Sequence, residues 1–468
     1  MDVPSTNHLP PELLVEITTF IPDQSTIFRL ATVCRHWHDA LTEAAILWIS
    51  VDCRSESRTS ILLQRSKSVP IDVTVDCFRY APGAISLVAN HIHRMRSIDV
   101  TLCSRTPANS YPPYSRAPAD VYYLLNGSAP ILKAVRMQGG DYPGPIQPLP
   151  LHSSSFRGQF PALRTLWLEG YPFDLAQSVP TMTSGLTTLV LDNQRLHDLR
   201  DLLDYLEHCE NLEHLKINLP NLEGTVLAPR IVSLPKLREL QLVSLPLTTL
   251  HHLSFPPSSD LTVQPHAMGS ARGYLVVDVW TEDGLLHIFE SRTIKGIKIT
   301  FTGHKCVVGL SGSHLALTVK TFTDLSRPSS FYSDYLDSFQ SLPIKTTESF
   351  VFARLPPYPF AKTLRLQSCT RLLTQMPALE QITLDISIAP SFIRALELVD
   401  GDLLCHKLRE LIIVRRAHDK VNLWNRLLAL SSLRKDHGCP LMYRVGLYTS
   451  SDWENLIPRK GWSNFCSL

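Results

Sequence analysis

The chain lacks the features that mark secreted and membrane-spanning proteins. Its ten cysteines are scattered and none forms a C-x-x-C pair, which favours reduced thiols. No uncharged apolar run reaches the roughly 18 residues that a membrane-spanning helix needs, and the chain does not begin with the basic and then apolar pattern of a secretion signal. The sequence therefore predicts a soluble protein of the cytoplasm, the nucleus or both, with no membrane partner.

A charge excess of one sign and a recognisable catalytic motif are also missing. The 45 Lys and Arg residues balance 43 Asp and Glu residues, so nucleic acid is disfavoured as a principal ligand. The Gly-rich stretch 303–313 matches neither a phosphate-binding loop nor a nucleophile elbow, and is expected to be a turn. His304 and Cys306 lack the second pair of ligands that a zinc site needs. We therefore predict no enzyme activity, no metal and no cofactor.

What the chain does contain, at its start, is the pattern of a short amphipathic helix. Pro10 and Pro11 suit a first helical turn, where a missing backbone N–H costs nothing. Leu13, Leu14 and Ile17 then follow at helical spacing. The first helix is therefore expected to begin near Pro11.

A second helix is predicted after Pro22, with Asp23 or Ser25 as its N-cap. Apolar residues recur at offsets of three, four or seven along residues 27–41, which predicts one continuous helix. A third short turn ends on Trp48. A unit of about forty residues has too little interior to bury all of these side chains, so part of the apolar surface needs a partner.

The series LPPELL at 9–14, VCRHW at 33–37 and LW at 47–48 resembles an F-box. The resemblance implies a subunit of a cullin-based ubiquitin ligase, in which the F-box binds a Skp-type adaptor and the adaptor binds the cullin. The alternative is a three-helix fragment of the downstream domain. The residues that the resemblance assigns to adaptor binding are Leu9, Pro10, Leu13, Leu14, Ile17, Pro22, Leu30, Val33 and Trp37.

Downstream, a leucine pattern repeats with the form L-x-x-L-x-L. It begins at Leu163, Leu186, Leu212 and Leu237, in steps of 23, 26 and 25 residues, within the period of about 20 to 29 residues of leucine-rich repeats. It returns less regularly, as at Leu364. No single repeat buries its own leucines, so neighbouring repeats are expected to stack into a parallel-stranded solenoid.

These patterns predict an α/β fold in which a three-helix F-box at 1–50 and a linker helix at 51–69 precede a curved, leucine-rich-repeat-like solenoid at 70–468. The solenoid is irregular, because most repeats lack the expected Asn or Cys at the ninth position. Within 261–352, strand patterns such as 294–301 and 315–322 follow each other closely. There we predict a strand-rich insertion in which hairpins replace helices.

The function predicted is that of a substrate receptor, in which the repeats hold an unknown target protein. Irregular leucine-rich F-box proteins of this kind are abundant in fungi. One alternative is a scaffold or interaction module that works without the cullin, and another is a hydrolase or transferase in 261–352, for which Ser311, His304 or Cys306 must meet in a pocket. Exposed basic and aromatic residues are the candidates for target binding, with an acidic or phosphorylated target for the last two: Arg164, Trp167, Lys216, Arg238, Arg415 and Arg416.

Overall fold

The computed structural model divides into two compact units. The N-terminal unit comprises residues 1–228 and 232–236, and the C-terminal unit comprises 229–231 and 237–468. The structure describes residues 9–21, 23–76, 79–102, 119–139, 159–169, 183–192, 199–219, 230–245, 247–264, 292–302, 305–322, 336–337, 339, 342–355, 364–397, 403–415 and 423–447.

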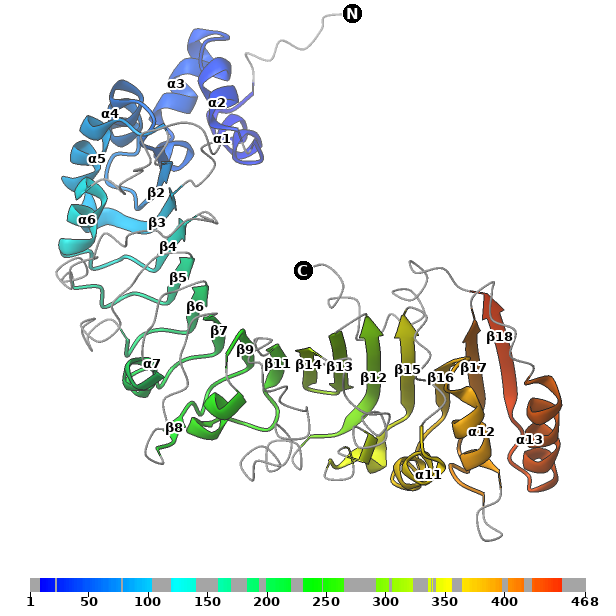
Figure 1. Cartoon of the computed structure of the whole chain (residues 1–468). Coiled ribbons are helices and arrows are strands. Elements are labelled where there is room, and N and C mark those ends of the chain that lie inside the picture. The colour runs from blue at the N-terminus through cyan, green and yellow to red at the C-terminus, as the bar shows by residue number, and fades with distance from the viewer. Residues whose placement is uncertain are drawn as a thin grey trace, which may run out of the picture. The chain divides into compact units, whose positions relative to one another are not determined.

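The N-terminal unit begins with short helices (Figure 1): α1 (Pro11–Thr19), α2 (Gln24–Leu30), α3 (Arg35–Glu43) and the 3-10 helix η2 (Ala45–Trp48). The prediction of one continuous helix over 27–41 is wrong, because the chain leaves the helix between α2 and α3. Thr32 Oγ1 donates a hydrogen bond to the Arg29 carbonyl at 2.7 Å, which competes with the helical ladder. Cys34 then adopts an extended backbone before α3 begins.

A parallel sheet follows, and its strands lie side by side in chain order. They are β1 (Ser50–Asp52), β2 (Ile71–Asp76), β3 (Met95–Leu102), β4 (Ala134–Gly139), β5 (Thr165–Glu169), β6 (Thr188–Asp192) and β7 (His214–Asn218). The connecting elements include α4 (Glu56–Arg65), α5 (Pro82–Ala89), η3 (Ile92–Arg94), α6 (Ala119–Asn126) and α7 (Leu199–Glu207), and β8 (Val232–Ser233) closes the unit.

Alternation along the strands separates a core face from a polar face. The leucines of the L-x-x-L-x-L pattern point into the core beneath the helices; Leu163, Leu166 and Leu168 are fully buried. Alternate residues point to the opposite side, as the pleat of a strand requires. We call this opposite side the polar face, and the strand register aligns its central row as Asp52, Thr74, Asp99, Arg136, Trp167, Val190 and Lys216.

The segment 51–69, for which a linker helix is predicted, contains both α4 and most of β1. Val51 pairs with Val73 of the next strand and is fully buried. The sheet therefore starts directly after η2. Leucines at helical spacing along 196–208 predict a helix there, and the structure has α7 in this segment, with Leu199, Leu202 and Leu206 among its buried residues.

The C-terminal unit holds a mixed sheet (Figure 1) with the strand order β9-β11-β14-β13-β12-β15-β16-β17-β18. The strands are β9 (Glu239–Val243), β11 (Asp260–Gln264), β12 (Ile294–Thr302), β13 (Lys305–Gly312), β14 (Leu315–Phe322), β15 (Ser349–Leu355), β16 (Gln381–Asp385), β17 (Glu410–Arg415) and β18 (Met442–Leu447). Other elements are η7 (Leu247–His252), β10 (Leu253–Ser254), η9 (Ile344–Thr346), α11 (Leu366–Thr374), α12 (Ala389–Leu396) and α13 (Trp424–Asp436).

Two sequence expectations fail in this unit. The Gly-rich stretch is not a turn, because β13 runs antiparallel to both β12 and β14. Leu364 and Leu366 do not belong to a strand; α11 begins at Leu366, and Cys369, Leu372 and Leu373 are buried at helical spacing. The hairpins expected in the strand-rich segment are present.

The long run of parallel strands is consistent with leucine-rich repeats. In the described part of the chain, no helix combines the length and the apolar character that crossing a membrane requires.

Candidate functional site

The helix α1 carries an uncovered apolar stripe. Leu13, Ile17 and Phe20 are 45%, 51% and 81% exposed, and their spacing of four and then three residues places them on one side of the helix. On the other side Leu14 and Thr18 are fully buried, and Thr18 Oγ1 donates to the Leu14 carbonyl at 2.6 Å. This helix therefore packs through one face and leaves apolar side chains on the other.

Two more exposed apolar residues lie in or close to elements that contact α1. Val33, 62% exposed, lies two residues before the start of α3, and Ile46 lies exposed in η2; both α3 and η2 contact α1. His36 Nε2 donates to the Leu9 carbonyl at 2.8 Å, which ties the first turn of α3 to the residues before α1. We call Leu13, Ile17, Phe20, Val33 and Ile46 the apolar stripe.

The core of this helical region is built around Trp48. Its side chain is fully buried, and its Nε1 donates to the Leu41 carbonyl at 2.8 Å. The Phe28 ring meets the Trp48 ring edge-on at 4.9 Å between centroids. Trp48 therefore stabilises the helices from within and is not part of the exposed apolar surface.

Asp23 caps α2, as predicted. Its carboxylate accepts hydrogen bonds from the backbone N–H and the hydroxyl of both Ser25 and Thr26, at 2.6 to 3.2 Å. These bonds, the hydroxyl bonds most of all, hold the pKa of Asp23 far below its usual range. The helix start is therefore fixed by ordinary N-cap chemistry.

The predicted adaptor-binding residues occupy three kinds of position. Pro10, Leu13, Ile17 and Val33 are exposed, and Leu9, Leu30 and Trp37 are half-buried. Leu14 is a correction to the predicted set, because it is fully buried within this chain and has no surface to offer a partner. Pro22 lies outside the described residues. The predicted set omitted two exposed residues, Phe20 and Ile46; the helical spacing from Leu13 was a signal for Phe20, whereas Ile46 had none.

Residues 6–54 match the family model described as F-box-like. The N-terminal region is an F-box-like domain. A search of curated proteins found no match to the chain. An F-box implies binding to a Skp-type adaptor, and F-box proteins are typically non-catalytic components of ubiquitin ligases.

Arginines of α4 join the F-box-like domain to the sheet. The Arg65 guanidinium lies 4.5 Å from the Trp48 ring centroid and 5.4 Å from that of Phe28. Gln24 Nε2 donates to the Ser50 carbonyl of β1 at 2.8 Å, and Arg58 Nη2 donates to Gln24 Oε1 at 3.3 Å. The domain is therefore packed directly against the first strand and helix of the sheet.

The centre of the polar face combines an aromatic ring with charged groups. The Arg136 guanidinium lies 4.4 Å from the centroid of the half-buried Trp167 ring. Trp167 Nε1 and Gln138 Nε2 each donate to Glu169 Oε2 at 3.3 Å. Trp167 is thus held in place from two sides while part of its surface stays accessible.

The predicted target-binding residues fall in both units. Trp167 and Lys216 lie on the polar face, where Lys216 is 3.4 Å from Asp192. Arg164 precedes β5, and its Nη1 donates to the Gly185 carbonyl at 2.9 Å. In the C-terminal unit, Arg238 is exposed just before β9 and Arg415 ends β17. Arg416 lies outside the described residues, and the role of this set stays a prediction.

The described residues hold no arrangement typical of an active site. No three His, Cys, Asp or Glu side chains among them lie close enough to hold a metal ion. Of the residues that the enzyme hypothesis requires, Ser311 and Cys306 lie apart along β13, and His304 is outside the described range. Burial raises the pKa of the Cys209, Cys369 and Cys405 thiols to about 12, so these thiols are poor nucleophiles.

Proposed function

We propose that this chain is a substrate-recognition subunit of a Skp/cullin/F-box ubiquitin ligase. The observation that carries the proposal is the apolar stripe on the F-box-like domain. Leu14, Leu41 and Trp48 fill the small core of that domain, yet the stripe remains in water, where apolar surface is costly. Burial of the stripe against a Skp-type adaptor would relieve that cost.

In this role the chain performs no bond chemistry. It holds a target protein near the ubiquitin-charged enzyme that the cullin brings, so that transfer to a target lysine becomes effectively intramolecular. The direct packing of Arg65 on Trp48 supports the role, because it keeps the sheet in a fixed position relative to the adaptor-binding helices.

Adaptor recovery from cells tests the proposal. We expect Leu13→Ala/Ile17→Ala to reduce co-purified adaptor at least about tenfold, because each truncated side chain loses roughly 1.5 to 3 kcal/mol of burial when fully covered. The matched control is Ile231→Ala/Leu428→Ala. It removes the same groups from exposed positions, 68% and 55% accessible, in the C-terminal unit. The thermal unfolding midpoint should be unchanged in both variants.

Equal adaptor recovery by the two double variants would overturn the proposed binding surface. Recovery of the cullin separates the receptor hypothesis from the scaffold hypothesis. If the wild-type chain brings down adaptor and cullin together, the receptor role is supported. Adaptor without cullin would favour a scaffold that works outside the ligase.

A further inference from the structure

The polar face of the N-terminal unit is richer in carboxylates than in cations. In the described strands β1 to β7, the Lys or Arg side chains on this face are Arg136, Lys216 and Arg96, the last of which donates to Asp72. The carboxylates are Asp52, Asp72, Asp76, Asp99, Glu169 and Asp192. The sign of this excess is opposite to that expected of a surface that binds an acidic target.

Three of these carboxylates have cationic partners within the chain. Asp52 lies 3.3 Å from Arg58, Asp192 lies 3.4 Å from Lys216, and Asp72 accepts bonds from Arg96. Their charge is therefore largely balanced, and they offer little to an incoming partner.

Glu169 and Asp99 have different surroundings, although the charge of Arg136 acts on Asp99 and offsets part of the rise in its pKa. Glu169 Oε2 accepts its hydrogen bonds from neutral donors, the indole of Trp167 and the amide of Gln138. Asp99 Oδ1 is buried and receives no hydrogen bond, although a buried carboxylate oxygen without a donor is costly. Glu169 therefore has capacity for a cationic donor supplied from outside, whereas the enclosed Oδ1 of Asp99 adds only its negative charge to the face.

Strand register places Arg136 between Asp99 and Trp167, and Glu169 lies beside Trp167 on the same strand. Asp99 pairs with Arg136 of β4, and Arg136 pairs with Trp167 of β5; Glu169 follows two residues later on the same face as Trp167. A lysine or arginine can lay its aliphatic stem on an indole while its charged end reaches a carboxylate. The Trp167 ring with the Glu169 carboxylate beside it fits such a side chain.

We propose that the polar face binds a segment of the target protein that is rich in lysine and arginine. Glu169 accepts hydrogen bonds from its cations, Asp99 adds negative charge to the same face, and Trp167 provides the packing surface. The inference rests on the proposed function, since it names the class of target, but the contact itself needs neither adaptor nor cullin.

Peptide binding to the full chain tests the inference. The probe is a labelled peptide of alternating arginine, lysine and glycine, compared with a peptide in which glutamate replaces each cation; binding is followed by fluorescence anisotropy. We expect the basic peptide to bind more tightly than the acidic one. Its affinity should fall as salt is raised, because exposed charges are screened.

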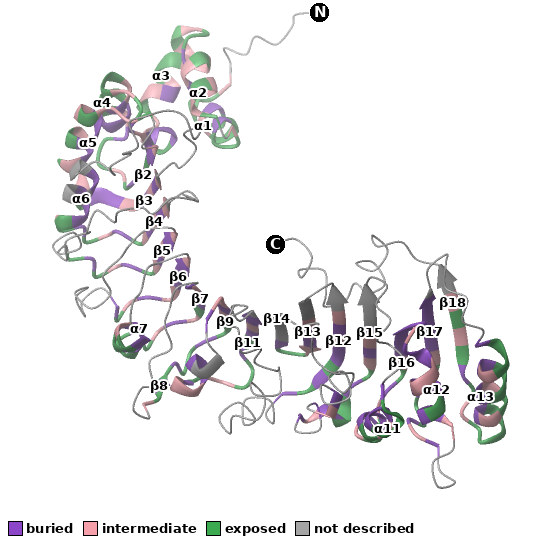
Figure 2. Ribbon diagram, viewed as in Figure 1, coloured by how far each residue is buried: buried purple, intermediate pink, exposed green. Residues whose placement is uncertain are grey.

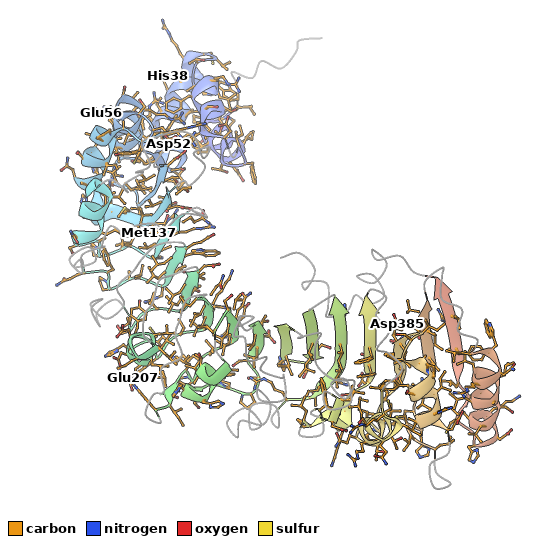
Figure 3. The ribbon with its side chains drawn as sticks, viewed as in Figure 1. His38, Asp52, Glu56, Met137, Glu207 and Asp385 are labelled. Carbon is orange, nitrogen blue, oxygen red and sulfur yellow. The ribbon has the colours of Figure 1, made fainter. Side chains whose placement is uncertain are left out.

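Two matched double variants locate the contact. Asp99→Asn/Glu169→Gln should weaken binding of the basic peptide about tenfold, the effect of losing roughly 1.4 kcal/mol. Asp204→Asn/Glu207→Gln makes the same charge change on α7, on the helical side of the same sheet, where Figure 3 labels Glu207. This control should bind like the wild type. Equal loss in both variants, or tighter binding of the acidic peptide, would overturn the inference.

A third variant separates loss of the contact from loss of folding. Trp167→Phe keeps an aromatic ring but removes the indole donor to Glu169. It should weaken peptide binding, while its thermal unfolding midpoint should equal that of the Asp204→Asn/Glu207→Gln control. Adaptor recovery by Asp99→Asn/Glu169→Gln should match the wild type. If the wild-type chain binds the basic peptide but recovers no adaptor, the ligase role fails while this contact stands.

Discussion

Strand β5 of the N-terminal unit and strand β17 of the C-terminal unit differ in how many of their faces are buried. In the N-terminal unit, strands such as Thr165–Glu169 alternate between buried leucine and partly accessible polar or aromatic residues. In the C-terminal unit, Ile412 and Val414 of β17 are only 8% and 2% exposed, although they alternate with the core residues Leu411 and Ile413. Figure 2 shows β17 mostly in the colour of buried residues.

The number of buried faces of each strand is reflected in its sequence. A strand with one buried face reads T-L-W-L-E, whereas one buried on both faces reads as a continuous apolar run, L-I-I-V. A surface that recognises another protein must be accessible and carry specific polar groups. The polar face of the N-terminal unit meets that condition, and the described part of β17 does not.

The largest expected effect tests whether the two units are stable separately. Phe392 is fully buried and lies 5.7 Å and 6.1 Å from the ring centroids of Phe350 and Phe352. Phe392→Ala should cost the C-terminal unit about 3 to 5 kcal/mol. Limited proteolysis should then cleave that unit first, while adaptor recovery stays at the wild-type level.

The control for that change is Leu428→Ala, at an exposed position of α13, which should alter stability by less than about 0.5 kcal/mol. If Phe392→Ala also abolished adaptor recovery, the two units would unfold together. The comparison would then concern the residue composition of the two units and not their separate stabilities.

The next effect concerns two carboxylates on adjacent strands of the polar face. Burial acts to raise the pKa of Asp72, but hydrogen bonds from Arg96 and Ser97 and the Arg96 charge outweigh it and lower the pKa. The ionised form is thus favoured by folding. Asp72→Asn should cost roughly 1.5 to 3 kcal/mol at neutral pH. Because the pKa is lowered, this deficit should shrink as pH falls below the ordinary value of 3.8, a trend that urea unfolding at several pH values measures.

Asp99 should respond in the opposite direction. Burial raises its pKa, and the charge of Arg136 offsets only part of that rise. Folding therefore favours the protonated form, so that the contribution of Asp99 to stability is present at low pH and is lost as pH rises through its pKa in the folded protein. Asp99→Asn should then leave the protein as stable as the wild type, or more stable, at neutral pH. A loss of stability equal to that of Asp72→Asn would contradict this assignment.

Much of the fold could be predicted from the sequence, because its signals are local and periodic. Leucine spacing predicted the strands from β5 to β7, and the helix near α7 followed from Leu199, Leu202 and Leu206. The failures came where one pattern fits two structures. Leu364 and Leu366 match the repeat, but Cys369 and Leu372 extend an equally good helical pattern that packing selected.

The candidate sites were predicted less completely. The F-box motif identifies the docking helices, but the residues carried over from it include Leu14, which faces the core, and omit Phe20, which is exposed. The motif gives residue positions and not the packing of each side chain. The charge of the polar face depends on which distant residues the register aligns, such as Asp99, Arg136 and Trp167. No local pattern in the sequence encodes that alignment.

The smallest expected effect measures the burial difference itself. Ile412→Val and Thr165→Ser each remove one methyl-sized group from the side of a strand opposite to its core residues. Ile412 is buried, so its change should leave a small cavity and cost about 0.5 to 1.5 kcal/mol. Thr165 is half-exposed, so its change should stay within about 0.5 kcal/mol. Urea unfolding of both variants resolves the difference. Equal costs would mean that β5 and β17 bury these positions alike, and that the polar face at β5 is not the accessible surface that target binding requires.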